Sequence, residues 1–106
     1  MSDLDDVMRL CRIERIELEA WIEREWVMPE RGAAGFHFTE ADVARVALVC
    51  DLRRDLAIEE EAIPVVLSLI DQVYALRRTL RRVSAAVETL PEPLREAFLA
   101  RLNRDD

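Results

Sequence analysis

The sequence holds few of the side chains that catalyse reactions, and their spacing builds no catalytic motif. His37 is the single histidine and lies between Phe36 and Phe38, with no serine, cysteine or acid placed to make it a general base. Cys11 and Cys50 are the two cysteines, and neither belongs to a CxxC pair or to a cluster with histidine. Glycine-rich phosphate loops and zinc-protease motifs are absent as well. We therefore expect a protein that is not an enzyme and that needs no cofactor or metal.

The charged side chains favour a basic partner over nucleic acid. The chain has 22 acids against 15 bases, a net charge of −7. Residues 1–35 hold 9 acids and 5 bases, residues 36–62 hold 7 and 3, and residues 63–106 hold 6 and 7. An acidic field of this kind repels nucleic acid and anionic membranes and speeds encounter with basic proteins. Solubility alone is the alternative explanation, and we give it equal weight.

Two short helices are expected at the start of the chain. The first is indicated by an apolar stripe with helical spacing, with Ser2 or Asp3 placed to cap it, namely Leu4, Val7, Met8 and Cys11. After a short link around residues 12–16, the second helix has Leu18, Trp21 and Ile22 as its inward face and ends before Pro29. Two short helices joined by a brief turn are typical of a helix-turn-helix.

A small wing and a third helix are expected next. The segment RGAAGFHF contains both glycines of the chain and therefore its tightest turns. Thr39 opens the sequence TEAD, in which the hydroxyl can cap a helix and Asp42 can return the bond to the backbone. The helix that follows carries Val43, Val46, Ala47 and Cys50 on one face. We therefore expect it to form the centre of a compact N-terminal head, made of these three helices and the wing.

A long fourth helix is expected to start near Glu60, because Pro64 is tolerated only in the first turn of a helix. Its apolar residues are spaced by three or four positions, a heptad seam with one three-residue stammer. A helix from there to Leu90 extends about 45 Å, which is more than a head of about 55 residues can cover. We therefore expect a homodimer whose interface includes Val66, Ile70, Val73, Leu76, Leu80, Val83 and Val87.

The alternative to a dimer is an intramolecular helical hairpin with the tail. The segment after Pro91 and Pro93 is too short to cover the long helix, so we favour the dimer. Leu94, Phe98, Leu99 and Leu102 predict a short amphipathic helix in this tail.

The expected fold class is all-α, a winged helix-turn-helix head followed by a long dimerising helix and a short C-terminal helix. The corresponding boundaries are residues 1–58, 59–90 and 91–106. The beginning of the chain, MSDLDDVMRL, is acidic and lacks the basic and apolar regions of a secretory signal, and no apolar run approaches the length of a membrane span. We expect a cytoplasmic protein.

The second helix argues against the function that a helix-turn-helix first suggests. Such a helix normally enters the major groove of DNA, where affinity depends on neutralised phosphates. Residues 17–25, ELEAWIERE, hold four glutamates against one arginine. This helix would therefore face the phosphates with a net negative charge.

These features together resemble the MerR-type winged-helix group. The matching residues are Leu18, Trp21, Ile22, Pro29, Gly35, Phe36, Phe38, Thr39, Glu40 and Asp42. Within that group the acidic second helix, DLRRDLAI and AIPVVLSLIDQVYALRRTLRRV resemble the chaperone-modulator (CbpM-type) family. This resemblance implies a dimer that binds the J-domain of a DnaJ-like co-chaperone and inhibits it, without DNA or cofactor.

The first hypothesis is accordingly a chaperone modulator that docks a basic J-domain on an acidic surface at the end of the third helix. The residues we expect there are Asp51, Arg54, Asp55, Glu59 and Glu60. The second is a MerR-like transcriptional regulator that binds DNA as a dimer, with phosphate contacts from Arg12, Arg15, Arg31, Arg53 and Arg54. The third is a scaffold that uses the long helix to join other chains.

Overall fold

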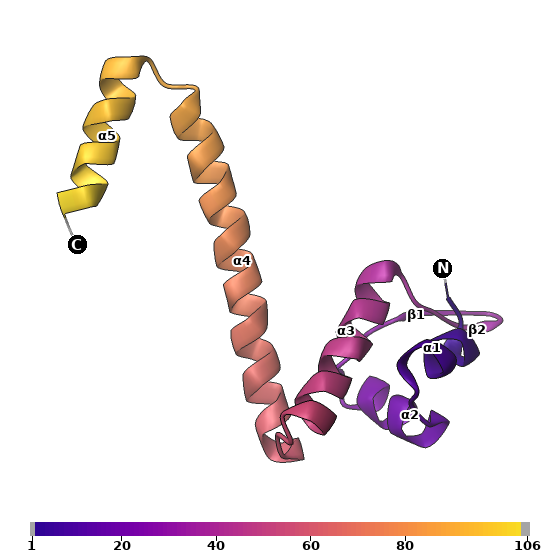
Figure 1. The fold of residues 1–106 in the computed structure, drawn as a ribbon. Coiled ribbons are helices and arrows are strands. Elements are labelled where there is room, and N and C mark those ends of the chain that lie inside the picture. The colour runs from indigo at the N-terminus through magenta and orange to yellow at the C-terminus, as the bar shows by residue number, and fades with distance from the viewer. Residues whose placement is uncertain (1, 105–106) are drawn as a thin grey trace. The chain divides into compact units, whose positions relative to one another are not determined.

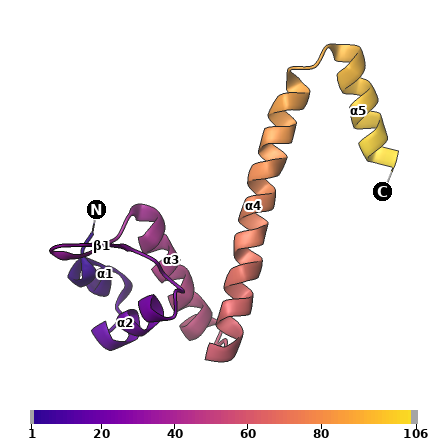
Figure 2. The same cartoon turned by 180° about the vertical axis from the view of Figure 1, so that it is seen from behind.

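The computed structural model describes residues 2–104, and their contacts divide the chain into two compact units between Leu67 and Ser68 (Figure 1). The first unit, called the head below, holds three α-helices and a small antiparallel hairpin. The second holds most of α4 (Ile63–Glu88) and all of α5 (Glu92–Arg104). Figure 2 shows the same elements from behind, with α4 as one uninterrupted helix.

Two short helices open the head. α1 (Leu4–Cys11) begins with a capping box, in which the Asp3 side chain accepts from the Asp6 amide and the Asp6 side chain accepts from the Asp3 amide. It ends where Arg12 turns into the left-handed region at φ 52°. α2 (Arg15–Glu23) follows after a link of three residues and buries Leu18 and Trp21. The capping by Asp3 and the short link are as the sequence indicated.

The wing is a two-stranded antiparallel hairpin of β1 (Glu30–Gly32) and β2 (Gly35–His37). Gly35 has φ 118°, a conformation that side chains with a Cβ rarely adopt. A Cβ at Gly32 would lie 2.9 Å from the His37 imidazole. The backbone of this turn therefore requires glycine at position 35, whereas a side chain at position 32 would displace the His37 ring.

α3 (Glu40–Cys50) starts with the expected capping box between Thr39 and Asp42. It continues into a π-helical turn, η1 (Asp51–Asp55), and the chain then reverses through Ala57 at φ 51°. A 3-10 turn, η2 (Glu60–Ala62), leads into α4. Helical structure thus resumes at Glu60, with Pro64 in the first turn of α4.

The core of the head is apolar and joins all of its helices. Its buried side chains come from α1, α2, α3, η1 and the residue that follows β2. They include Val7, Leu18, Trp21, Phe38, Val46, Val49 and Leu52. Trp21 and Trp26 are both buried, with ring centroids 6.3 Å apart. Ile63 and Leu67 at the start of α4 are also buried. The expected boundary at residue 58 lies in the turn before α4, and buried side chains continue to Leu67.

The described chain is therefore a winged helix-turn-helix head followed by a long and a short helix, which confirms the expected fold class. In the second unit most of the large apolar side chains remain exposed. Examples are Leu76 at 62% and Leu80 at 65% of their full exposure. Among residues 2–104, no helix combines the length and the apolar character needed to cross a membrane.

Candidate functional site

The helix that would read DNA, α2, carries carboxylates on its outer surface. Glu17, Glu19 and Glu23 are all exposed. Arg15 is the basic residue of α2, and its guanidinium lies 3.0 Å from the Asp5 carboxylate. The exposed surface of α2 is therefore acidic, and its one cation is already paired.

A hollow lies between α2 and the wing, and we call it the wing hollow. It is lined by Glu19, Ile22, Glu23, Arg31 and Phe36 and has a volume of about 290 Å³. Ile22 and Phe36 are half-buried, whereas the three charged side chains are exposed. The Arg31 guanidinium lies over the Phe36 ring, 4.9 Å from its centroid. The hollow thus has an apolar floor and a charged rim.

A second hollow, called the cysteine hollow, lies where the end of α1 meets the end of α3. Its volume is about 240 Å³, and its lining residues are Leu10, Cys11, Ala47, Cys50, Asp51, Arg54 and Asp55. The Cys50 thiol lies 3.9 Å from the Cys11 carbonyl oxygen. Burial raises the pKa of both thiols above the ordinary value. The nearby Arg54 guanidinium lowers the pKa, but its effect is smaller than that of burial. These thiols are protonated and poor nucleophiles at neutral pH.

Three of the five residues expected at a partner surface, Asp51, Arg54 and Asp55, come together in the cysteine hollow. Arg54 also has a structural task, because its guanidinium donates to the carbonyl oxygens of Cys11 at 3.2 Å and Arg12 at 2.7 Å. These are carbonyls that the end of α1 leaves without helical partners. Arg54 therefore closes α1 against η1.

The other two residues, Glu59 and Glu60, lie on the turn before α4 and do not line the cysteine hollow. The Glu60 carboxylate lies 3.2 Å from the Arg24 guanidinium and 4.0 Å from that of Arg53. Arg53 also donates to the Ile58 carbonyl oxygen at 2.7 Å. Glu60 is therefore paired with arginines of the head, and both Glu59 and Glu60 are exposed.

The expected dimer seam on α4 is only partly exposed. Val66, Ile70 and Val87 are half-buried, whereas Val73, Leu76, Leu80 and Val83 are exposed. Leu69 is exposed at 55% and was not among the expected seam residues. With Leu69 in place of Ile70 the spacing alternates three and four without a stammer, through Val66, Leu69, Val73, Leu76, Leu80, Val83, Val87 and Leu90. That unbroken spacing is the signal in the sequence that identifies Leu69.

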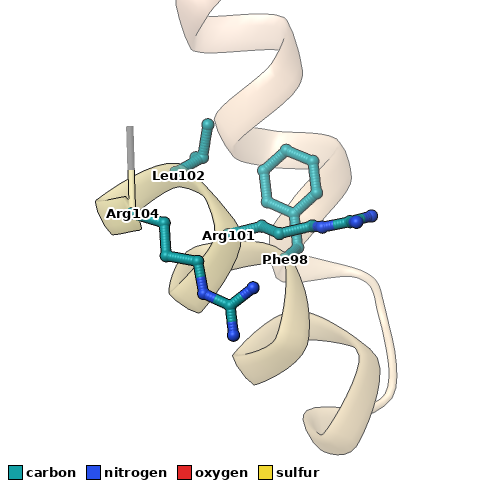
Figure 3. A pocket seen from close by; sticks show the side chains of 4 residues that line it. All are labelled: Phe98, Arg101, Leu102 and Arg104. Atoms are coloured by element: carbon teal, nitrogen blue, oxygen red, sulfur yellow. The ribbon is translucent and has the colours of Figure 1, made fainter. Parts of the chain in front are cut away.

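A further pocket lies on α5 alone. Its lining consists of Phe98, Arg101, Leu102 and Arg104, which Figure 3 shows on two successive turns of this helix. The lining has no acid, histidine or cysteine, so it provides neither a general base nor a metal ligand. Within residues 2–104, no group of three or more histidines, cysteines or acids is placed to hold a metal ion.

The arginines that a DNA-binding reading requires are mostly engaged elsewhere. Arg15 pairs with Asp5, Arg53 with Glu60, and Arg54 with the end of α1. Arg31 is exposed in the wing but lies over Phe36. Arg12 is exposed, and within residues 2–104 its guanidinium has no ion-pair or hydrogen-bond partner, so of the five arginines it is the one left for phosphates.

Comparison with known proteins agrees with this architecture. No curated protein and no solved structure matches the chain. A family model described as MerR HTH family regulatory protein matches residues 3–85, which include the head and most of α4. The chain therefore belongs to the MerR HTH family of regulatory proteins.

Proposed function

We propose that this member of the MerR HTH family regulates by binding protein, and that its partner is the J-domain of a DnaJ-like co-chaperone in the cytoplasm. The observation that carries the proposal is the charge of α2. This helix presents Glu19 and Glu23, beside the wing, where a DNA-reading helix needs neutral or basic side chains. The protein acts without catalysis, by covering a surface of its partner.

Electrostatics separates this function from DNA binding. Double-stranded DNA carries about one negative charge per 1.7 Å of its axis, and specific proteins offset it with arginine and lysine. The Glu19 and Glu23 carboxylates would approach phosphates at a cost, and the one cation of α2, Arg15, lies in an ion pair with Asp5. A basic protein surface meets the same carboxylates favourably.

The cysteine hollow supports the choice of a basic partner. Asp51 and Asp55 stand at its edge, and Cys11, Ala47 and Cys50 give it an apolar lining. Leu10 and Leu56 are exposed at 68% and 65%. Apolar residues bordered by carboxylates suit a helix with one apolar and one cationic face. The resemblance to CbpM-type chaperone modulators is our reason for proposing a J-domain as that partner, since J-domains present a basic helix to Hsp70.

We propose that a second copy of the chain buries the apolar stripe of α4. The apolar stripe of this helix has unbroken heptad spacing from Val66 to Val87, which is the pattern that a partner helix buries. A monomer would leave Leu69, Leu76 and Leu80 in water, each at more than half of its full exposure. A homodimer also presents two heads, so one regulator can bind two J-domains.

Charge reversal at the cysteine hollow tests this function. In an Asp51→Arg, Asp55→Arg variant, we expect affinity for the purified J-domain to fall by about tenfold or more, because two favourable charges become repulsive. The matched control is Glu88→Arg with Glu96→Arg, which makes the same change in net charge outside the head. Equal losses in both variants would show that only net charge matters, and unchanged affinity in the first would refute this surface.

The alternative function is a MerR-like transcriptional regulator that binds DNA as a dimer. Family membership and the exposed Arg31 of the wing favour it. It requires duplex binding whose affinity falls steeply with salt. The acidic α2 makes us place it second.

A further inference from the structure

We infer that the wing hollow is a docking site for a basic amphipathic helix of a partner protein. An apolar side chain of that helix enters between Ile22 and Phe36, and its cationic side chains pair with Glu19 and Glu23. This inference rests on the proposed function insofar as the ligand is a protein segment and not DNA. It assigns the surface that reads DNA in a winged helix-turn-helix to the recognition of a basic protein.

The geometry of α2 places the necessary groups together. Glu19, Ile22 and Glu23 are three and four residues apart, so they lie on one face of the helix. Phe36 of β2 lines the same hollow. The volume of about 290 Å³ is at the lower end of small-molecule sites, which span about 300–1,000 Å³, so the hollow suits an inserted side chain.

The charges of the hollow select a cation. Within residues 2–104 the carboxylates of Glu19 and Glu23 have no ion-pair partner, in contrast to Glu60 on the turn before α4. Arg31 is the cation on the rim, and its guanidinium lies over the Phe36 ring. Two unpaired carboxylates beside half-buried apolar groups favour a ligand with both cationic and apolar side chains.

At Arg31 the geometry predicts that loss of the charge raises the affinity for a cationic ligand, whereas loss of Glu19 and Glu23 lowers it. Its guanidinium repels a cationic ligand and covers part of the aromatic floor. Replacement by glutamate reverses that charge and uncovers Phe36, so binding should become tighter. A variant that merely damaged the fold would not bind more tightly.

The first experiment locates the binding site on the whole chain. The probe is a synthetic helix with lysine on one face and leucine on the other, titrated into isotopically labelled protein. We expect amide chemical-shift changes in residues 19–23 and 31–36 that weaken as salt is added. Changes confined to residues 51–55, or no changes at all, would overturn the inference. Changes at residues 19–23 on raising the protein concentration alone would assign the hollow to a second copy of the chain, and would also overturn it.

The second experiment measures affinity for the same probe. We expect Glu19→Arg with Glu23→Arg to weaken binding by about tenfold or more and Arg31→Glu to tighten it several-fold. The matched control is Glu14→Arg with Glu17→Arg, which changes the charge of the same helix equally. Glu14 is the cap residue just before α2, and Glu17 is two positions before Glu19, so it points to nearly the opposite side of the helix. Circular dichroism checks that each variant is folded.

The outcomes for the probe and the J-domain are separable. If the control variant loses as much affinity for the probe as the Glu19 and Glu23 variant, or if Arg31→Glu binds no more tightly, the inference is wrong. If the probe binds at the wing hollow but the J-domain does not bind, the inference stands and the proposed partner is wrong. If the J-domain binds but the probe does not shift the wing hollow, the proposed function stands without this site.

Discussion

The Arg54 guanidinium in η1 donates a hydrogen bond of 2.7 Å to the carbonyl oxygen of Arg12, just after the end of α1. A second bond of 3.2 Å reaches the Cys11 carbonyl oxygen. Arg54 and Arg12 are 42 positions apart in the sequence. A single side chain therefore joins the first helix of the head to the turn that follows α3, beside the cysteine hollow.

Loss of this side chain should destabilise the head. We expect Arg54→Ala to lower the free energy of unfolding by about 1–2 kcal/mol, because two carbonyl oxygens lose a charged donor. The control Arg9→Ala removes a surface ion pair with Asp6 and should cost less than about 0.5 kcal/mol. Urea denaturation measures both values. An Arg54 variant as stable as the Arg9 variant would contradict the structural role.

The start of α3 depends on the Thr39 hydroxyl, which accepts from the Asp42 amide at 3.1 Å. Thr39→Ala leaves that amide without its cap, so we expect the free energy of unfolding to fall by about 1 kcal/mol. Thr39→Ser keeps the hydroxyl and should retain most of the stability. Urea denaturation of the two variants decides the matter, and equal losses would mean that the cap contributes nothing.

The capping box of α1 should make the stability of this helix depend on pH. The hydrogen bond from the Asp3 amide and the neighbouring Arg9 hold the pKa of Asp6 below its ordinary value of 3.8. The stabilisation by Asp6 is therefore fully present above 3.8 and is lost as pH falls through the lower, folded-state pKa. An NMR titration of the Asp6 carboxyl should give a midpoint below 3.8. A midpoint at or above that value would contradict the capping geometry.

The apolar stripe of α4 should control the oligomeric state. We expect the unmodified chain to have the mass of a dimer by light scattering, and Leu76→Glu with Leu80→Glu to have that of a monomer, because buried carboxylates are strongly disfavoured. Tyr74→Ser is the control, since Tyr74 is exposed but lies off the heptad stripe. A monomeric unmodified chain, or a variant that remains dimeric, would show that this stripe is not the interface.

Local sequence signals predicted those parts of the fold that depend on neighbouring residues. The Thr39–Asp42 box, the glycine turn of the wing and the position of Pro64 each depend on one short segment, and all agree with the structure. The sequence pattern also placed Trp21 at a core position, and its side chain is buried.

Features that depend on distant parts of the chain could not be predicted in the same way. In the sequence Arg54 is a polar residue near the end of a helix. Only folding brings it to the carbonyl groups at the end of α1. Glu60 likewise meets Arg24 across a wide gap in the sequence. The wing hollow requires α2 and β2 to lie together, so the spacing of Glu19 and Glu23 alone did not single it out. Leu69 was missed for a different reason, because Ile70 beside it fits a similar spacing.

Binding of protein in place of DNA by this acidic winged helix-turn-helix can be tested directly in one titration. Fluorescence anisotropy would compare a labelled J-domain and a labelled mixed-sequence DNA duplex in the same buffer at physiological ionic strength. We predict saturable binding of the J-domain and no binding of the duplex. Tight duplex binding that weakens steeply with added salt, with no binding of the J-domain, would contradict the account.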